Sequence, residues 1–133
     1  MSLSCAQAEN ALRIAKEKAI ELGVAVGIAV VDARGDLLCC VRMDGARWYT
    51  ADVARAKAFA SSTWGKTTKD LRELADHPVT RTVTALGNDY ITPAQGAVPI
   101  IKDGVILGAI GASGADPESD EIISQAGVDA IVK

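Results

Sequence analysis

The chain has 133 residues, of which 49% are hydrophobic and 23% charged, and its formal net charge is −3. These values are typical of one folded domain with a sizeable core, so we expect a single domain over residues 1–133. The lack of a basic block argues against a nucleic-acid partner, and no apolar run is long enough to predict a membrane partner.

The N-terminal segment does not have the pattern of a signal peptide, because residues 1–8 are polar and basic residues interrupt the first apolar face. We therefore expect a cytoplasmic protein. Its three cysteines are Cys5, Cys39 and Cys40. An odd count with two adjacent members does not predict a disulfide framework, and neighbours in a strand point to opposite faces, which disfavours a shared metal.

The first third of the chain predicts a helix followed by a β-hairpin. Ser4 and Gln7 match a capping box at the start of the helix, and Gly23 is placed to end it. The run VAVGIAVV is almost continuously apolar, which predicts a strand covered on both faces. The predicted helix, strand, turn and returning strand occupy residues 4–22, 24–31, 32–36 and 37–43.

The middle of the chain predicts three helices and a short strand, over residues 51–63, 69–75, 78–86 and 90–92. Thr50 is a plausible N-cap for the first of them, and Thr67 or Thr68 for the second. Small residues form a stripe on the first of these helices, which indicates close contact with a sheet. Lys57 lies on or beside that stripe, where we expect it to be solvated unless a pocket rim lets it bind an anion.

Four of the five aromatic residues fall in this same region: Trp48, Tyr49, Phe59 and Trp64. Clustered aromatics can line a flat hydrophobic ligand pocket. They are equally consistent with an oligomer contact or with ordinary core packing, and the sequence leaves these alternatives open.

The stretch at residues 95–114 predicts a second hairpin, with apolar runs at 97–101 and 105–112 joined by Lys102-Asp103-Gly104. Gly108 and Gly111 in its second run mark either the close approach of a helix or the floor of a ligand site. A last helix is predicted after Asp116-Pro117. Its expected apolar side consists of Ile122, Ile123, Ala126, Ala130 and Ile131.

The strands joined by short turns must be antiparallel, so the order of elements predicts an α+β fold with helices packed on an antiparallel sheet. The full predicted order is α-β-β-α-α-α-β-β-β-α. No internal repeat or linker interrupts it.

His77 is the only histidine, so neither a zinc site nor a Ser–His–Asp triad is indicated. A single histidine can ligate haem iron, which makes His77 a weak candidate haem ligand, although a surface loop position explains it better. The glycines of the second hairpin lie within a strand rather than between a strand and a helix, which disfavours a phosphate-binding loop.

Polar residues at the ends of elements are the remaining candidates for chemistry. Arg42 and Asp44 follow the second strand, Ser113 ends the last strand, and Asp120 lies in the first turn of the last helix. An aspartate at a helix N-terminus first stabilises the helix. If Arg42, Asp44 and Asp120 converge, they form a general acid–base pair and an anion clamp, and are the candidate catalytic residues.

Five segments together resemble the GlcG/HbpS-like family, also described as haem-degrading HbpS-like proteins. The resemblance extends over nearly the whole chain and includes Asp120 and Glu121. The segments are ELGVAVGIAVVDARGDLL at 21–38, VRMDGA at 41–46, ADVARAKAFASSTWGKTT at 51–68, GAVPI at 96–100 and GAIGASG at 108–114.

The resemblance implies a profilin-like fold with a five-stranded antiparallel sheet flanked by helices, and self-association ranging from dimers to octamers. Some relatives bind haem, and one secreted relative serves redox sensing. A related domain forms the C-terminal part of PduO-type corrinoid adenosyltransferases of diol metabolism. Other relatives accompany glycolate, glycerol or propanediol utilisation.

Three functional hypotheses follow. The first is a cytoplasmic homo-oligomer that binds haem or another planar ligand at a pocket closed by a second copy, as an accessory to glycolate or glycerol/propanediol metabolism. The second is an enzyme that acts on a small hydroxylated or carboxylated metabolite, and the third is a structural role without a ligand. Candidate ligand-binding residues are Arg42, Asp44, Lys57, Trp64, Pro99, Ser113 and Gly114.

Overall fold

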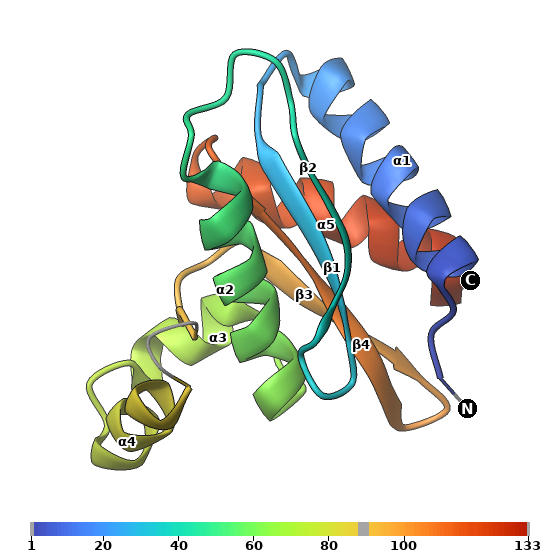
Figure 1. The fold of residues 1–133 in the computed structure, drawn as a ribbon. Coiled ribbons are helices and arrows are strands. Elements are labelled where there is room, and N and C mark those ends of the chain that lie inside the picture. Colours follow the sequence, from blue (N-terminus) through green and yellow to red (C-terminus); the bar gives the residue numbers. More distant parts are fainter. Residues whose placement is uncertain (1, 88–90, 133) are drawn as a thin grey trace.

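The computed structural model describes residues 2–87 and 91–132 (Figure 1). Four strands form one sheet in the order β2-β1-β4-β3, and every neighbouring pair is antiparallel. The helices and strands, in chain order, are α1 (Cys5–Leu22), β1 (Gly27–Asp32), β2 (Leu37–Arg42), α2 (Thr50–Trp64), α3 (Thr68–Leu71), the 3-10 turn η1 (Arg72–Leu74), α4 (Pro78–Leu86), β3 (Ala97–Lys102), β4 (Val105–Ser113) and α5 (Pro117–Val132).

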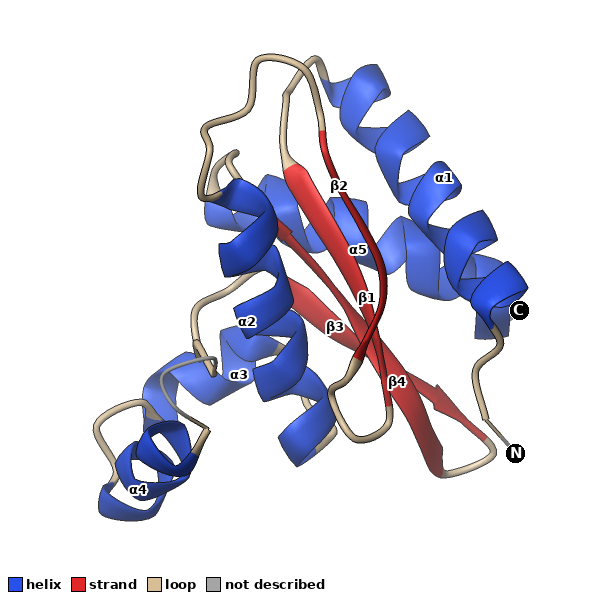
Figure 2. Cartoon of the chain, in the orientation of Figure 1, coloured by secondary structure: helices blue, strands red, loops and turns tan. Residues whose placement is uncertain are grey.

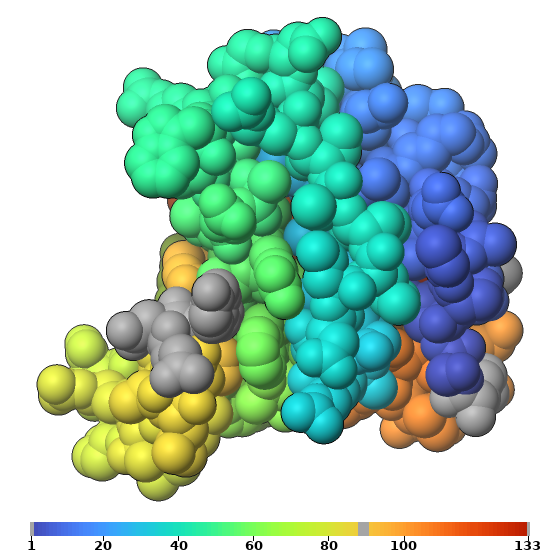
Figure 3. All heavy atoms as spheres, viewed as in Figure 1, coloured from blue at the N-terminus to red at the C-terminus, as the bar shows by residue number. Residues whose placement is uncertain are grey.

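The sheet lies between two helical layers (Figure 2). Helices α1 and α5 pack together on one face, where their side chains and those of the sheet form the main hydrophobic core. Helix α2 covers β1 and β4 on the other face. The predicted α+β class is confirmed, and the segment α3–η1–α4 projects from one end of α2 (Figure 3).

Local signals in the sequence account for the first elements. The Ser4 side chain accepts from the Gln7 N–H at 3.1 Å, and the Gln7 side chain accepts from the Ser4 N–H at 2.9 Å, which confirms the capping box. Gly23 ends the helix in the left-handed region at φ 73°. Strand β1 is buried from Gly27 to Val31, as predicted for a strand covered on both faces.

The glycines of β4 allow close packing of backbone on backbone. A Cβ atom on Gly111 would collide with the carbonyl oxygen of Ala54 and lie 3.0 Å from the Ala58 amide, so α2 rests directly on the sheet. Gly108 is crowded in the same way by the Val31 carbonyl of the neighbouring strand. Of the two alternatives for these glycines, the structure therefore shows close packing.

The sheet has four strands in the described residues, so the predicted fifth strand and the profilin-like five-stranded arrangement are not confirmed. The fifth strand was expected at 90–92. Tyr90 lies outside the described residues, while Ile91 and Thr92 have no strand partner. Instead, the Thr92 N–H donates to the Ala56 carbonyl of α2 at 3.1 Å, which ties this segment to a helix.

Two details of the helices also differ from expectation. Thr50 is the first residue of α2 rather than its N-cap, and its hydroxyl donates to the Arg47 carbonyl at 2.8 Å. In α5, Ile122 and Ala130 are exposed, because the buried face is centred on Asp120, Ser124 and Gly127. Ile123 is fully buried and Ile131 packs against the core as predicted, so apolar spacing identified only part of the buried face.

The alanines of α2 are buried within the chain itself. Ala54, Ala56, Ala58 and Ala60 are all at most 8% exposed, so no partner is needed to cover them.

Among the described residues, no helix is long and apolar enough to cross a membrane.

Candidate ligand pocket

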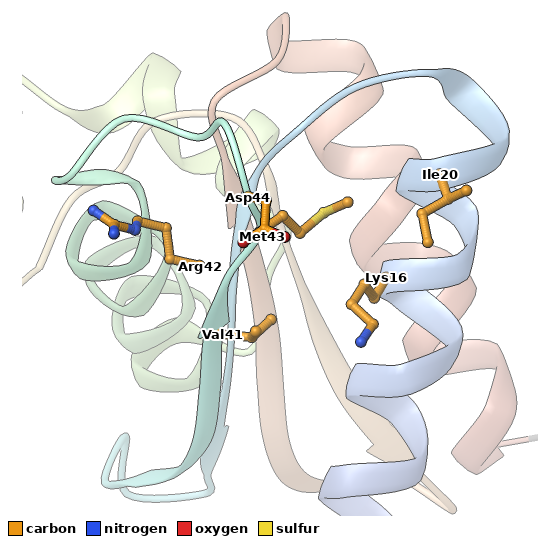
Figure 4. Close-up of a pocket in the computed structure, with 6 residues that line it drawn as sticks. All are labelled: Lys16, Ile20, Val41, Arg42, Met43 and Asp44. Atoms are coloured by element: carbon orange, nitrogen blue, oxygen red, sulfur yellow. The ribbon is translucent and has the colours of Figure 1, made fainter.

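The residues that follow β2 border a groove between that strand and α1 (Figure 4). This α1–β2 groove has a volume of about 330 Å³ and is lined by Lys16, Ile20, Val41, Arg42, Met43 and Asp44. The Arg42 side chain points away from Lys16 and α1, while Met43 extends toward Ile20 (Figure 4). The alternation of side chains along a strand explains why neighbours point in opposite directions.

A second hollow lies where β4 ends and where α2 and α5 begin. This α2–α5 pocket has a volume of about 400 Å³ and is lined by Arg47, Tyr49, Lys57, Ala94, Gln95, Ser113, Gly114, Ala115, Pro117 and Asp120. The chain turns sharply out of β4 at Gly114, whose φ is 126°. A Cβ atom there would lie 3.0 Å from the Ala25 carbonyl, so glycine is required for this turn.

Lys57 and Asp120 form a buried ion pair in the wall of the α2–α5 pocket. The Lys57 Nζ lies 3.2 Å from the Asp120 Oδ2, and it also donates to the Ala112 carbonyl at 3.0 Å. Their side chains are 8% and 3% exposed. The expectation that Lys57 is solvated is therefore wrong, because Asp120 from α5 supplies the countercharge that permits its burial.

Both carboxylate oxygens of Asp120 accept hydrogen bonds, since the Ala115 N–H donates to Oδ1 at 3.0 Å. Burial raises the pKa of Asp120, and the favourable charge of Lys57 and the Ala115 hydrogen bond only partly offset this. Asp120 thus acts as a fixed acceptor that holds Lys57 and closes the first turn of α5.

The four aromatic residues near α2 do not form one cluster. Trp48 and Tyr49 make an edge-to-face pair with ring centroids 5.5 Å apart, and they are 76% and 38% exposed. Phe59 would contact a Cβ atom on Gly35, and Trp64 packs on a small core group around Leu71. Only Tyr49 of the four lines the α2–α5 pocket.

The candidate site residues therefore separate into three groups. Lys57, Ser113, Gly114 and Asp120 meet in the α2–α5 pocket, whereas Arg42 and Asp44 line the α1–β2 groove. The convergence of Arg42, Asp44 and Asp120 required for an acid–base pair does not occur in one pocket. Trp64 and Pro99 line neither hollow.

His77 is exposed and lies immediately before α4, outside both hollows. Its Nδ1 accepts from the Val79 N–H at 3.2 Å, so its observed role is to cap that helix. The described residues contain no group of three or more His, Cys, Asp or Glu side chains able to hold a metal ion.

Arg47 and Gln95 line the α2–α5 pocket but were not predicted from the sequence. Arg47 lies in the loop before α2, and Gln95 precedes β3. Gln95 is 7% exposed, and Arg72 donates to its Oε1 at 3.1 Å. The only available signal was position, because both residues flank segments that carry the family resemblance.

Comparison with known proteins agrees with this fold. The family model for the haem degrading protein HbpS-like family matches residues 3–129. Protein GlcG of Escherichia coli K12 is 33% identical over 111 residues, which cover 84% of this chain and 81% of GlcG.

Two solved structures are similar over almost the entire chain. The crystal structure of HbpS has a TM-score of 0.88 and 28% identity, and the match covers 100% of this chain and 92% of HbpS. The crystal structure of a PduOC:heme complex has a TM-score of 0.86 and 26% identity, with 98% and 96% covered. The sequence match and the shared architecture show that this chain belongs to the HbpS-like family.

Proposed function

We propose that this protein binds haem at the α2–α5 pocket, in an assembly where a second copy completes the site. The observation that carries the proposal is a pair of exposed aromatic rings, Trp48 and Tyr49, beside a pocket lined by Arg47 and Lys57. The family match and the similarity to the PduOC:heme structure support haem as the planar ligand.

The donor set of the pocket fits the requirements of haem. A tyrosine oxygen is one of the protein ligands that hold haem iron, and Tyr49 is the residue of the pocket lining that provides one. Haem also carries two propionate groups, for which Arg47 and Lys57 supply positive charge. Trp48, at the edge of Tyr49, offers an aromatic surface to the macrocycle.

The pocket of one chain is small for a whole haem, which favours a site completed by a second copy. At about 400 Å³, it lies near the lower end of the range of roughly 300–1,000 Å³ found for sites of drug-sized ligands. It can enclose the propionate-bearing edge of a haem, while the rest of the ring would lie over Trp48. A second protein surface over Trp48 would exclude water from that part.

The alternative function, acid–base catalysis on a small hydroxylated or carboxylated metabolite, has less support from the geometry. A general base needs a carboxylate oxygen within hydrogen-bond reach of the substrate proton. The Asp120 side chain is 3% exposed and paired with Lys57, and Arg42 and Asp44 line a different hollow. The pocket is therefore better suited to binding than to proton transfer.

The test is a hemin titration of the purified protein, followed at the Soret band. We expect saturation at micromolar hemin, weaker binding by Trp48→Ala, and an altered Soret position for Tyr49→Phe, which keeps the ring but removes the oxygen. The matched controls are His77→Ala and Arg42→Ala, which change residues outside the pocket and should bind as the unaltered protein does. The absence of a saturable Soret shift at micromolar hemin would contradict the proposal.

A further inference from the structure

The inner end of the α2–α5 pocket contains hydrogen-bond donors that the protein itself does not satisfy. A lysine ammonium carries three N–H donors. Within the described residues, Lys57 uses two of them, toward the Ala112 carbonyl and the Asp120 carboxylate. The third is free for a group in the pocket that Lys57 lines.

Two neutral side chains beside Lys57 also have unused donors. Ser113 and Gln95 are each 7% exposed, so both are more than nine-tenths buried. Across residues 2–87 and 91–132, the Ser113 hydroxyl has no hydrogen-bond partner, and neither does the Gln95 Nε2. Both side chains line the pocket, so their unused donors are open to an acceptor that enters it.

The oxygens of Asp120 and the Gln95 Oε1, by contrast, already have partners in the protein. The Asp120 oxygens accept from Lys57 and Ala115, and the Gln95 Oε1 accepts from Arg72. The charged side chains of the lining are Arg47, Lys57 and Asp120, two positive and one negative, which leaves one net positive charge. A ligand that matches this environment is rich in acceptors and carries a single negative charge.

We propose that the inner end of the pocket is a subsite for one carboxylate group, recognised by Lys57, Ser113 and Gln95. A carboxylate accepts about four hydrogen bonds and balances the excess charge. The α5 helix of 16 residues begins at this pocket and adds the positive end of its dipole. The carboxylate is either that of a small free organic acid or a propionate of haem, and only the second source rests on the proposed function.

The first arm of the test measures binding of the small 2-hydroxy acid lactate by calorimetry, with lactamide as its neutral analogue. Because a hydrogen bond to a charged group is worth roughly 1.5–3 kcal/mol, we expect lactate to bind at least about tenfold more tightly than lactamide. Ser113→Ala and Gln95→Leu should each weaken lactate binding by about tenfold. Arg42→Ala, which lies in the α1–β2 groove, should leave it unchanged.

The second arm compares hemin with hemin dimethyl ester, whose propionates cannot carry charge. Tighter binding of hemin than of its ester, reduced in Ser113→Ala, assigns the carboxylate to haem. Discrimination between lactate and lactamide without any hemin binding supports the subsite and overturns the proposed haem function instead. If neither pair of ligands is discriminated by the unaltered, folded protein, the carboxylate subsite is overturned.

Discussion

Lys57 and Asp120 are separated by 63 residues in the chain, yet they form an ion pair of 3.2 Å that is shielded from solvent. The pair joins α2 to the start of α5, and the Lys57 hydrogen bond to the Ala112 carbonyl adds the end of β4. Three elements that surround the α2–α5 pocket are therefore held by one side chain. A substitution that removes only one of the two charges should therefore strongly reduce the stability of the fold.

Lys57→Met should lower the free energy of unfolding by about 3–5 kcal/mol, because it leaves the Asp120 carboxylate buried without its countercharge. The double variant Lys57→Met/Asp120→Leu should recover most of this loss, since neither charge remains. Urea unfolding measures both. The matched control is Arg13→Met, which breaks the exposed Arg13–Glu17 pair and should cost at most about 1 kcal/mol. Equal losses for Lys57→Met and Arg13→Met would contradict the assignment.

The burial of Lys57 also shows what the sequence could not reveal. Helix caps and turns depend on neighbours in the chain, so the bounds of α1 and the turn at Asp103-Gly104 follow from local patterns. The environment of Lys57 depends on a residue of the last helix, which no local pattern encodes. The same reason hid the polar part of the buried face of α5, where Asp120 and Ser124 make hydrogen bonds to other elements.

The candidate site was partly predictable for a similar reason. Ser113 and Asp120 were identified because they lie at the ends of elements, and the fold does bring them to one pocket. Arg42 and Asp44 were identified by the same rule but line another hollow, because the rule does not specify which ends meet. Gln95 was missed, since an uncharged side chain before a strand has no distinctive pattern.

Gly111→Val should destabilise the protein by at least about 1–3 kcal/mol, because its side chain would overlap the Ala54 carbonyl of α2. Thermal unfolding and chromatographic size measure the effect. The control Cys40→Val adds a branched side chain at an exposed position of β2 and should change stability by less than about 0.5 kcal/mol. An unchanged melting temperature for Gly111→Val would show that α2 does not approach β4 as closely as described.

The first turn of α5 should lose stability at low pH through Asp116. Its carboxylate accepts from the Ser119 N–H at 2.9 Å and from the Ser119 hydroxyl at 2.7 Å, which lowers the pKa of Asp116 below its ordinary value of 3.8. A lowered folded pKa means that the stabilisation is complete above the unfolded value and is lost as the pH falls through the folded one.

Asp116→Asn tests this because asparagine keeps an oxygen for the cap but does not titrate in this range. The difference in urea midpoint between the unaltered protein and Asp116→Asn should shrink or reverse as the pH is lowered from about 6 to about 2. The other carboxylates are common to both proteins and cancel in the difference, except for Asp120, whose pKa the Asp116 charge also raises. A difference that stays constant with pH would show that the Asp116 charge does not stabilise α5.

The thiol of Cys39 should react slowly with iodoacetamide. Burial, with a smaller effect of nearby Cys5 and Glu9, raises the pKa of Cys39 from 9.0 to about 11. Because the thiolate is the reactive form, this shift lowers the fraction of Cys39 present as thiolate by about 100-fold near pH 8. Cys5→Ser/Cys40→Ser retains only Cys39, while Cys5→Ser/Cys39→Ser retains the exposed Cys40 as a control. In the folded protein, Cys39 should be alkylated more slowly than Cys40, and the two rates should converge in urea. Equal rates in the folded protein would contradict the burial of Cys39.

The last prediction is that Trp48 lies at an interface between copies of this chain, beside the α2–α5 pocket. A side chain of this size that is 76% exposed leaves apolar surface in water, and such surfaces commonly mark contacts. Trp48→Ser should therefore shift sedimentation toward the monomer and weaken hemin binding together. The control is Leu86→Ser, since Leu86 is 78% exposed but lies on α4, in the projecting segment. If the unaltered protein is a monomer at micromolar concentration and Ser113→Ala binds hemin normally, the pocket is not completed by a second copy.

If Leu86→Ser dissociates the assembly and Trp48→Ser does not, the interface lies on the projecting segment. The exposed ring of Trp48 would then contact the ligand and not a second copy.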